Sequence, residues 1–86
     1  MTLAELNKGD RARITAVHAS EPNVQRLMIM GLVEGAELSC LGTSLGGDPL
    51  ELRLYGSAVS LRRADARHFK VDPLPDPAPA SRAAAS

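Results

Sequence analysis

The strongest constraint in this sequence is a set of short segments in which apolar and polar residues alternate. The clearest is LELRLY, in which Leu50, Leu52 and Leu54 alternate with polar residues. A period of two is typical of a strand with one buried face. Similar segments lie at 10–17, 36–41, 58–62 and 69–71. Strands this short favour a mainly β fold, and closing them into a small barrel would protect the edges of the sheet.

The segment 10–17, DRARITAV, departs from strict alternation near its end. Ile14 and Ala16 fall on one face of the expected strand, but Val17 should also face inward. A β-bulge near Thr15 and Ala16 would allow this, because one extra residue shifts the phase of the side chains. We therefore predict a bulged strand here.

One helix is expected, over residues 20–30. Ser20 or Glu21 can cap its N-terminus, and Pro22 lies in the first turn, where its missing N–H leaves no helical hydrogen bond unmade. Apolar residues follow at helical spacing and give a buried stripe. Gly31 comes next, which is the residue expected at a left-handed helix end.

The last fifteen residues, 72–86, differ in composition from the rest of the chain. They hold four of the six prolines, five alanines and a single large apolar residue, Leu74. Such a segment cannot bury enough apolar surface to offset the entropy of ordering it. We therefore expect one folded domain over 1–71 and a disordered Pro/Ala-rich tail over 72–86.

Charge and composition argue against several classes of protein. Ten Lys and Arg balance ten Asp and Glu, whereas nucleic-acid binders usually carry a basic excess. One Tyr, one Phe and no Trp leave no base-stacking platform. The longest apolar run, 27–33, is too short to span a bilayer, and the first ten residues show no signal-peptide pattern. With a single cysteine, we expect a cytoplasmic protein without direct membrane insertion and without nucleic acid as a partner.

Local charge keeps an RNA-binding barrel open as an alternative. Arg11 and Arg13 share one face of the first expected strand, and more arginines come late in the chain, at 62, 63 and 67. These side chains could form a basic stripe although the total charge is balanced.

Four side chains are candidate metal ligands: His18, Glu21, Cys40 and His68. Imidazole, carboxylate and thiolate all suit borderline divalent ions such as Fe(II) or Zn(II). His18 and Glu21 flank the junction between strand and helix, and His68 joins them if the last strand passes nearby. Cys40 shares the phase of Leu38 and is better explained as a core residue. The alternative is two surface histidines, because a metal site usually clusters three or four ligands; two chains together could supply that number.

The loop 42–49 contains a Gly-Gly-Asp-Pro stretch that is not a phosphate-binding loop. It lacks the GxxxxGK[ST] spacing, and a strand follows it. No pattern places a nucleophile beside a base either, so we predict that the protein is not an enzyme. A groove at this loop would lack the aromatic lining of polyproline-binding sites, and would depend on backbone pairing and aliphatic contacts.

Several short motifs follow one another along the chain. The segment RLMIMGLVEG at 26–35 combines Arg-Leu with Met-Gly-Leu and a further glycine, and Gly-Asp-Pro at 47–49 precedes a strand. Gly-Asp at 9–10 and Ser-Leu-Arg at 60–62 complete the pattern. Together these motifs resemble the ferrous iron transport protein A (FeoA) family. The resemblance covers nearly the whole expected domain and leaves only the tail outside.

The resemblance implies an SH3-like barrel of about five strands with one inserted α-helix. It also implies an accessory, regulatory role in ferrous iron uptake, through protein–protein interaction with a membrane transporter, FeoB, whose cytosolic part binds GTP. The same barrel occurs in iron-dependent repressors, where it mediates interactions and contributes to metal binding. The alternative function is therefore a small divalent-metal-binding protein or a metal-dependent regulator domain.

We expect partner contacts from the helix, the turn after it and the glycine-rich loop. The predicted contact residues are Arg26, Met30, Leu32, Gly46, Gly47, Asp48 and Pro49. Arg26 can bind carbonyl or carboxylate oxygens within the fold or reach a partner, since its guanidinium suits both settings. Exposed edges and outward apolar residues such as Val17 and Leu41 leave a homodimer open as well.

Overall fold

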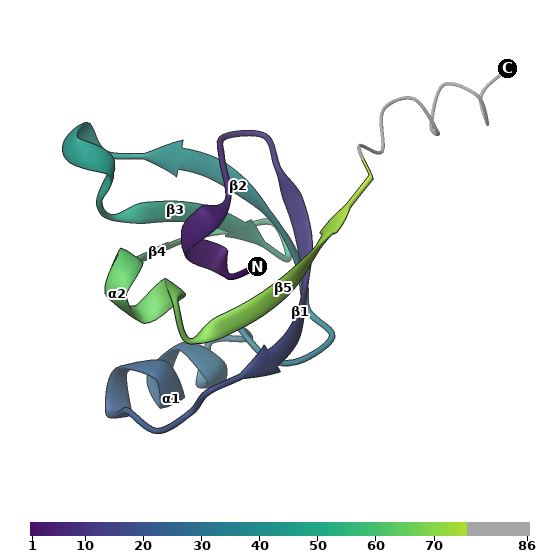
Figure 1. Cartoon of the computed structure of the whole chain (residues 1–86), viewed down its shortest axis with the longest axis vertical. Helices are drawn as coiled ribbons and strands as arrows, with labels where there is room; N and C mark the ends of the chain where they lie inside the picture. The colour runs from purple at the N-terminus through teal and green to yellow at the C-terminus, as the bar shows by residue number, and fades with distance from the viewer. Residues whose placement is uncertain (76–86) are drawn as a thin grey trace, which may run out of the picture.

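The computed structural model describes residues 1–75 of the 86. Five antiparallel strands form one curved sheet in the order β4-β3-β2-β1-β5 (Figure 1). The strands are β1 (Arg11–Val17), β2 (Glu37–Thr43), β3 (Leu50–Leu54), β4 (Ser57–Leu61) and β5 (Phe69–Leu74). The helices are α1 (Pro22–Ile29) and α2 (Arg63–Ala66), and the 3₁₀ turns are η1 (Leu3–Glu5) and η2 (Leu45–Gly47). This architecture confirms the predicted mainly β fold, with α1 as the inserted helix; α2 adds about one further helical turn.

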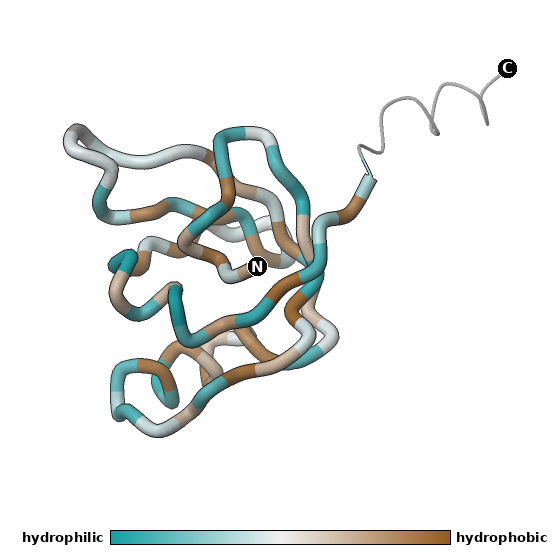
Figure 2. The backbone as a smooth tube through the Cα atoms, in the orientation of Figure 1, coloured by the Kyte–Doolittle hydropathy of each residue, from teal (hydrophilic) through white to brown (hydrophobic). Residues whose placement is uncertain are grey.

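The core is a single apolar cluster enclosed by the curved sheet. Leu50, Leu52 and Leu54 all point into it, as their alternation predicts, and Phe69 is fully buried. No polar or charged residue is buried within residues 1–75. Figure 2 shows hydrophobic and hydrophilic positions alternating along the strands. No helix of the described chain is long and apolar enough to cross a membrane.

β1 contains the predicted bulge. Its register against β5 shifts between Ile14 and Ala16. After the shift Ala16 is exposed and Val17 packs against the core. The extra residue thus reverses the phase of the last part of the strand, which the simple alternation could not accommodate.

α1 begins where the sequence predicts, with Glu21 as its N-cap and proline in its first turn. It ends one residue before the expected limit, since Met30 is the C-cap. Gly31 then takes a φ of +116°, and the N–H of Leu32 donates to the carbonyl of Leu27 at 3.1 Å. This closing turn satisfies helix carbonyls and folds the chain back onto the core.

Two boundaries differ from the sequence-based expectation. Tyr55, which the expected strand LELRLY includes, lies instead in the turn between β3 and β4. In this turn, Tyr55-Gly56, φ values of +51° and +81° give the geometry of a two-residue hairpin. β5 continues past residue 71 because Pro73 and Leu74 still pair with β1. Residues 76–86 lie outside the described residues, so the prediction of a disordered tail there stays a prediction.

Candidate partner-docking cleft

Most of the predicted contact residues lie along one side of the molecule. In Figure 1 α1, α2 and the β2–β3 loop follow one another along the left-hand side. Arg26 and Met30 are exposed at α1, and Gly46 and Asp48 are exposed in the loop. Leu32 is an exception, because its exposed fraction is 0%. Its predicted contact role is wrong, since the turn after α1 places its side chain in the core.

An open cleft of about 420 Å³ lies between α1 and β4 on this side. We call it the α1–β4 cleft. Leu27 and Leu61 are almost fully buried and form its floor, while Met30 adds an exposed apolar side chain. Arg26 and Arg62 line it as exposed cations. The cleft therefore combines buried leucines with two exposed arginines.

The positive charge of this cleft is not neutralised by ion pairs within residues 1–75. Neither Arg26 nor Arg62 has a carboxylate within salt-bridge distance there. Asp65 is the one acidic residue among those that line the cleft. A carboxylate from a partner could form charge-assisted, bidentate hydrogen bonds with either arginine.

The two arginines of β1, unlike those of the cleft, lie within ion-pair distance of a carboxylate. Arg11 and Arg13 lie 3.8 and 3.1 Å from the two carboxylate oxygens of Glu37 on β2. The single carboxylate offsets part of the charge of the two arginines, and this weakens the basic stripe on which the RNA-binding alternative depends.

Arg63 holds the β2–β3 loop beside the cleft. Its backbone N–H donates to Asp48 Oδ1 at 3.0 Å, and its Nε donates to the carbonyl of Gly47 at 2.5 Å. Its Nη1 donates to the carbonyl of Ala4 in η1. The preceding residue, Arg62, also lines a hollow with Asp48 and Pro49 and so joins the loop to the cleft. Neither Arg62 nor Arg63 is among the predicted contact residues, although both directly follow the Ser-Leu segment of β4.

The predicted metal ligands meet at the junction of β1, α1 and β5. His68 Nε2 lies 3.7 Å from Glu21 Oε2, and the rings of His18 and His68 are 6.3 Å apart. The last strand therefore does pass near the other two residues. Within residues 1–75, however, no three His, Cys, Asp or Glu side chains are grouped closely enough to hold a metal ion. Cys40 is elsewhere, buried in the core as expected.

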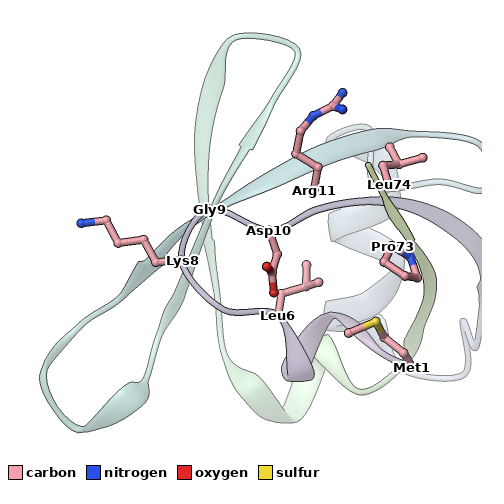
Figure 3. Close-up of a pocket in the computed structure, with 8 residues that line it drawn as sticks. All are labelled: Met1, Leu6, Lys8, Gly9, Asp10, Arg11, Pro73 and Leu74. Carbon is pink, nitrogen blue, oxygen red and sulfur yellow. The ribbon is translucent and has the colours of Figure 1, made fainter. Parts of the chain in front are cut away.

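A second hollow, of about 400 Å³, lies between the N-terminal segment and the end of β5 (Figure 3). Two of its polar side chains, Asp10 and Arg11, already make hydrogen bonds within the fold. Asp10 accepts a hydrogen bond from the N–H of Asn7 at 2.8 Å, and Arg11 Nη1 donates to the carbonyl of Pro75 at 3.1 Å. Lys8 points away from the hollow in Figure 3. The α1–β4 cleft is therefore the better candidate for docking.

Comparison with known proteins gives a consistent result. A family model described as the FeoA domain matches residues 1–73. Among curated proteins, the Fe(2+) transport protein A/Fe(2+) transporter FeoB fusion protein of Porphyromonas gingivalis is 35% identical over 72 residues. The match covers 84% of this chain and 8% of the fusion protein, so the chain spans only a small part of that relative's length.

Solved structures show the same likeness. The FeoA protein from Chlorobium tepidum superimposes with a TM-score of 0.79 at 45% identity, covering 87% of this chain and 71% of that one. Stenotrophomonas maltophilia FeoA, a prokaryotic SH3 domain protein complexed with zinc, gives a TM-score of 0.73 at 30% identity, with coverage of 84% and 89%. These likenesses confirm the expected SH3-like fold.

Proposed function

Since this chain belongs to the FeoA domain family, we propose that it is a non-enzymatic accessory protein of ferrous iron uptake that docks on the cytosolic part of a FeoB-type transporter. The observation that carries this proposal is the fusion protein, in which a sequence similar to this chain is joined to FeoB. Joining two modules in one chain raises the effective concentration of each at the other, which favours even weak docking. The proposed place of action is the cytoplasmic face of the membrane.

The α1–β4 cleft is the docking surface in this proposal. Its apolar floor supplies area to bury, and Arg26 and Arg62 supply recognition of an acidic group. Docking can regulate the transporter only if one state of its GTP-binding domain binds the cleft more tightly than another. The accessory protein would then shift the population of that state without taking part in any bond-making step.

Calorimetric titration of the full chain with the cytosolic part of a FeoB-type transporter tests this proposal. We expect binding, and we expect Arg26→Glu to weaken it by about tenfold or more, because the charge at the cleft is reversed. Arg53→Glu is the matched control: Arg53 is an exposed arginine of β3 that does not line the cleft. Its effect should stay below about twofold. Absence of binding at about 100 µM, or equal effects of both changes, would contradict the proposal.

A second candidate function, divalent-metal binding, is favoured by the approach of His68 Nε2 to Glu21 Oε2 at 3.7 Å. Because a stable site uses three or four ligands, a second copy of the chain would have to complete it. We expect Zn(II) to produce dimers of the wild-type protein, but not of His68→Ala, in analytical ultracentrifugation. A wild-type protein that stays monomeric with excess Zn(II) would contradict this function.

A further inference from the structure

β4 is an edge strand with one unpaired side. It stands at the end of the strand order, next to β3 only. The two-residue turn makes Leu54 and Ser57 a hydrogen-bonded pair. Hydrogen-bonded and non-hydrogen-bonded pairs alternate along an antiparallel ladder. Ala58 and Ser60 therefore direct their backbone N–H and C=O groups away from β3.

These outward groups are free within the described part of the chain. No backbone hydrogen bond to Ala58 or Ser60 comes from any loop, turn or helix of residues 1–75. Both residues are exposed. The edge therefore presents unmade donors and acceptors in the geometry that an additional strand requires.

The α1–β4 cleft adjoins the C-terminal end of this open edge, because Ser60 lines it and Ala58 does not. Ser60, at the edge, lines one side of the cleft, and Asn23, Arg26 and Met30 line the other. These three lie at i, i+3 and i+7, which is one flank of a helix. A groove between an edge strand and a helix flank is the arrangement that receives an extended peptide by strand addition.

We propose that the α1–β4 cleft binds an extended acidic and aliphatic segment of the transporter's cytosolic part as an added strand on β4. The segment would place an aliphatic side chain over Leu27 and Leu61 and a carboxylate beside Arg26 or Arg62. This proposal rests on the proposed function and names how the partner is recognised.

Charge and lining together determine the chemistry of the occupant. Two arginines against one carboxylate, Asp65, leave the cleft with a positive balance that favours an acidic segment over a basic one. No aromatic residue lines the cleft, so a polyproline helix would lack its usual platform. Backbone pairing would supply affinity, and the alternate side chains of the added strand would supply specificity.

Ser60→Pro is the sharpest test, because it removes the outward N–H and places a ring where the added strand would lie. Proline is tolerated at an edge position whose N–H faces solvent. Ser60→Ala is the matched control. It keeps the N–H, and both changes remove the hydroxyl contact with Glu51 Oε1 at 3.3 Å. Thermal unfolding of each variant verifies that it is folded.

We expect Ser60→Pro to weaken binding of the transporter's cytosolic part by about tenfold or more and Ser60→Ala by less than about twofold. Arg62→Glu leaves the backbone unchanged and should weaken binding as much as Ser60→Pro does. It replaces Ser60→Pro in this test if the proline variant does not fold. A second arm titrates the full chain with a synthetic peptide of alternating valine and glutamate and follows the amide signals of Ala58 and Ser60 by NMR.

The outcomes separate the two proposals. If the transporter fragment binds but neither Ser60→Pro nor Arg62→Glu weakens it, strand addition is overturned and the proposed function stands. If the fragment does not bind but the peptide shifts the Ala58 and Ser60 signals, the edge site stands and the transporter is the wrong partner. If neither ligand binds, both proposals are overturned.

Discussion

Replacing Arg63 with alanine should lower the free energy of unfolding by about 2–4 kcal/mol, because two backbone carbonyls lose a charged donor. The half-buried guanidinium binds the carbonyls of Gly47 and Ala4 and so connects the β2–β3 loop to η1. Hydrogen bonds to charged groups contribute about 1.5–3 kcal/mol each, and partial exposure reduces that value here. The backbone N–H of residue 63 can still donate to Asp48 in the variant, so the expected loss comes from the side chain alone.

Arg62→Ala is the matched control for this prediction. The Arg62 side chain is exposed and makes no hydrogen bond or ion pair within residues 1–75, so its removal should change stability by less than about 0.5 kcal/mol. Urea unfolding followed by far-UV circular dichroism measures both values. Equal stabilities of the two variants would show that Arg63 does not hold the loop. Arg63→Lys should fall between them, because a lysine cannot reach both carbonyls with a planar fork.

Gly31→Ala should lower the free energy of unfolding by about 2–4 kcal/mol, for two reasons that add. The backbone at Gly31 has a φ of +116°, which residues with a side chain rarely adopt. An added Cβ would also lie 3.2 Å from Leu54 Cδ2 and 3.5 Å from Tyr55 Cε2. The close approach of the α1 turn to the β3–β4 hairpin therefore depends on glycine.

Gly35→Ala separates the two reasons. Gly35 has a φ of +91°, but an added Cβ would meet no atom within 4 Å. It should show the backbone cost alone, about 1–2 kcal/mol. Urea unfolding should therefore find Gly31→Ala the more destabilised variant. If Gly35→Ala loses as much stability, the packing of the turn against the hairpin does not contribute.

The elements of this fold could be predicted from the sequence because their signals are local. The alternation of Leu50, Leu52 and Leu54 identifies β3, and the mismatch between Ala16 and Val17 identifies the bulge in β1. Both signals reflect which face of one short segment is buried. Neither depends on contacts with distant parts of the chain.

The docking cleft could not be predicted in the same way, because the residues of α1, β4 and α2 that line it are distant in the sequence. Arg26 and Arg62 line the same cleft only in the folded chain. The roles of Arg62 and Arg63 are also opposite, although the residues are adjacent and identical. One lines the cleft, while the other binds carbonyls of the loop and η1. Leu32 is a predicted contact residue that lies in the core, because contacts with distant parts of the chain determine how the turn after α1 packs.

The most direct test of docking through the α1–β4 cleft is an amide chemical-shift map of the full chain during titration with the cytosolic part of a FeoB-type transporter. Docking through the cleft should give the largest changes in residues 23–30 and 58–62 and leave the β1–β5 pair nearly unchanged. Largest changes instead at the hollow of Figure 3 or around His68, with the cleft unchanged, would contradict it.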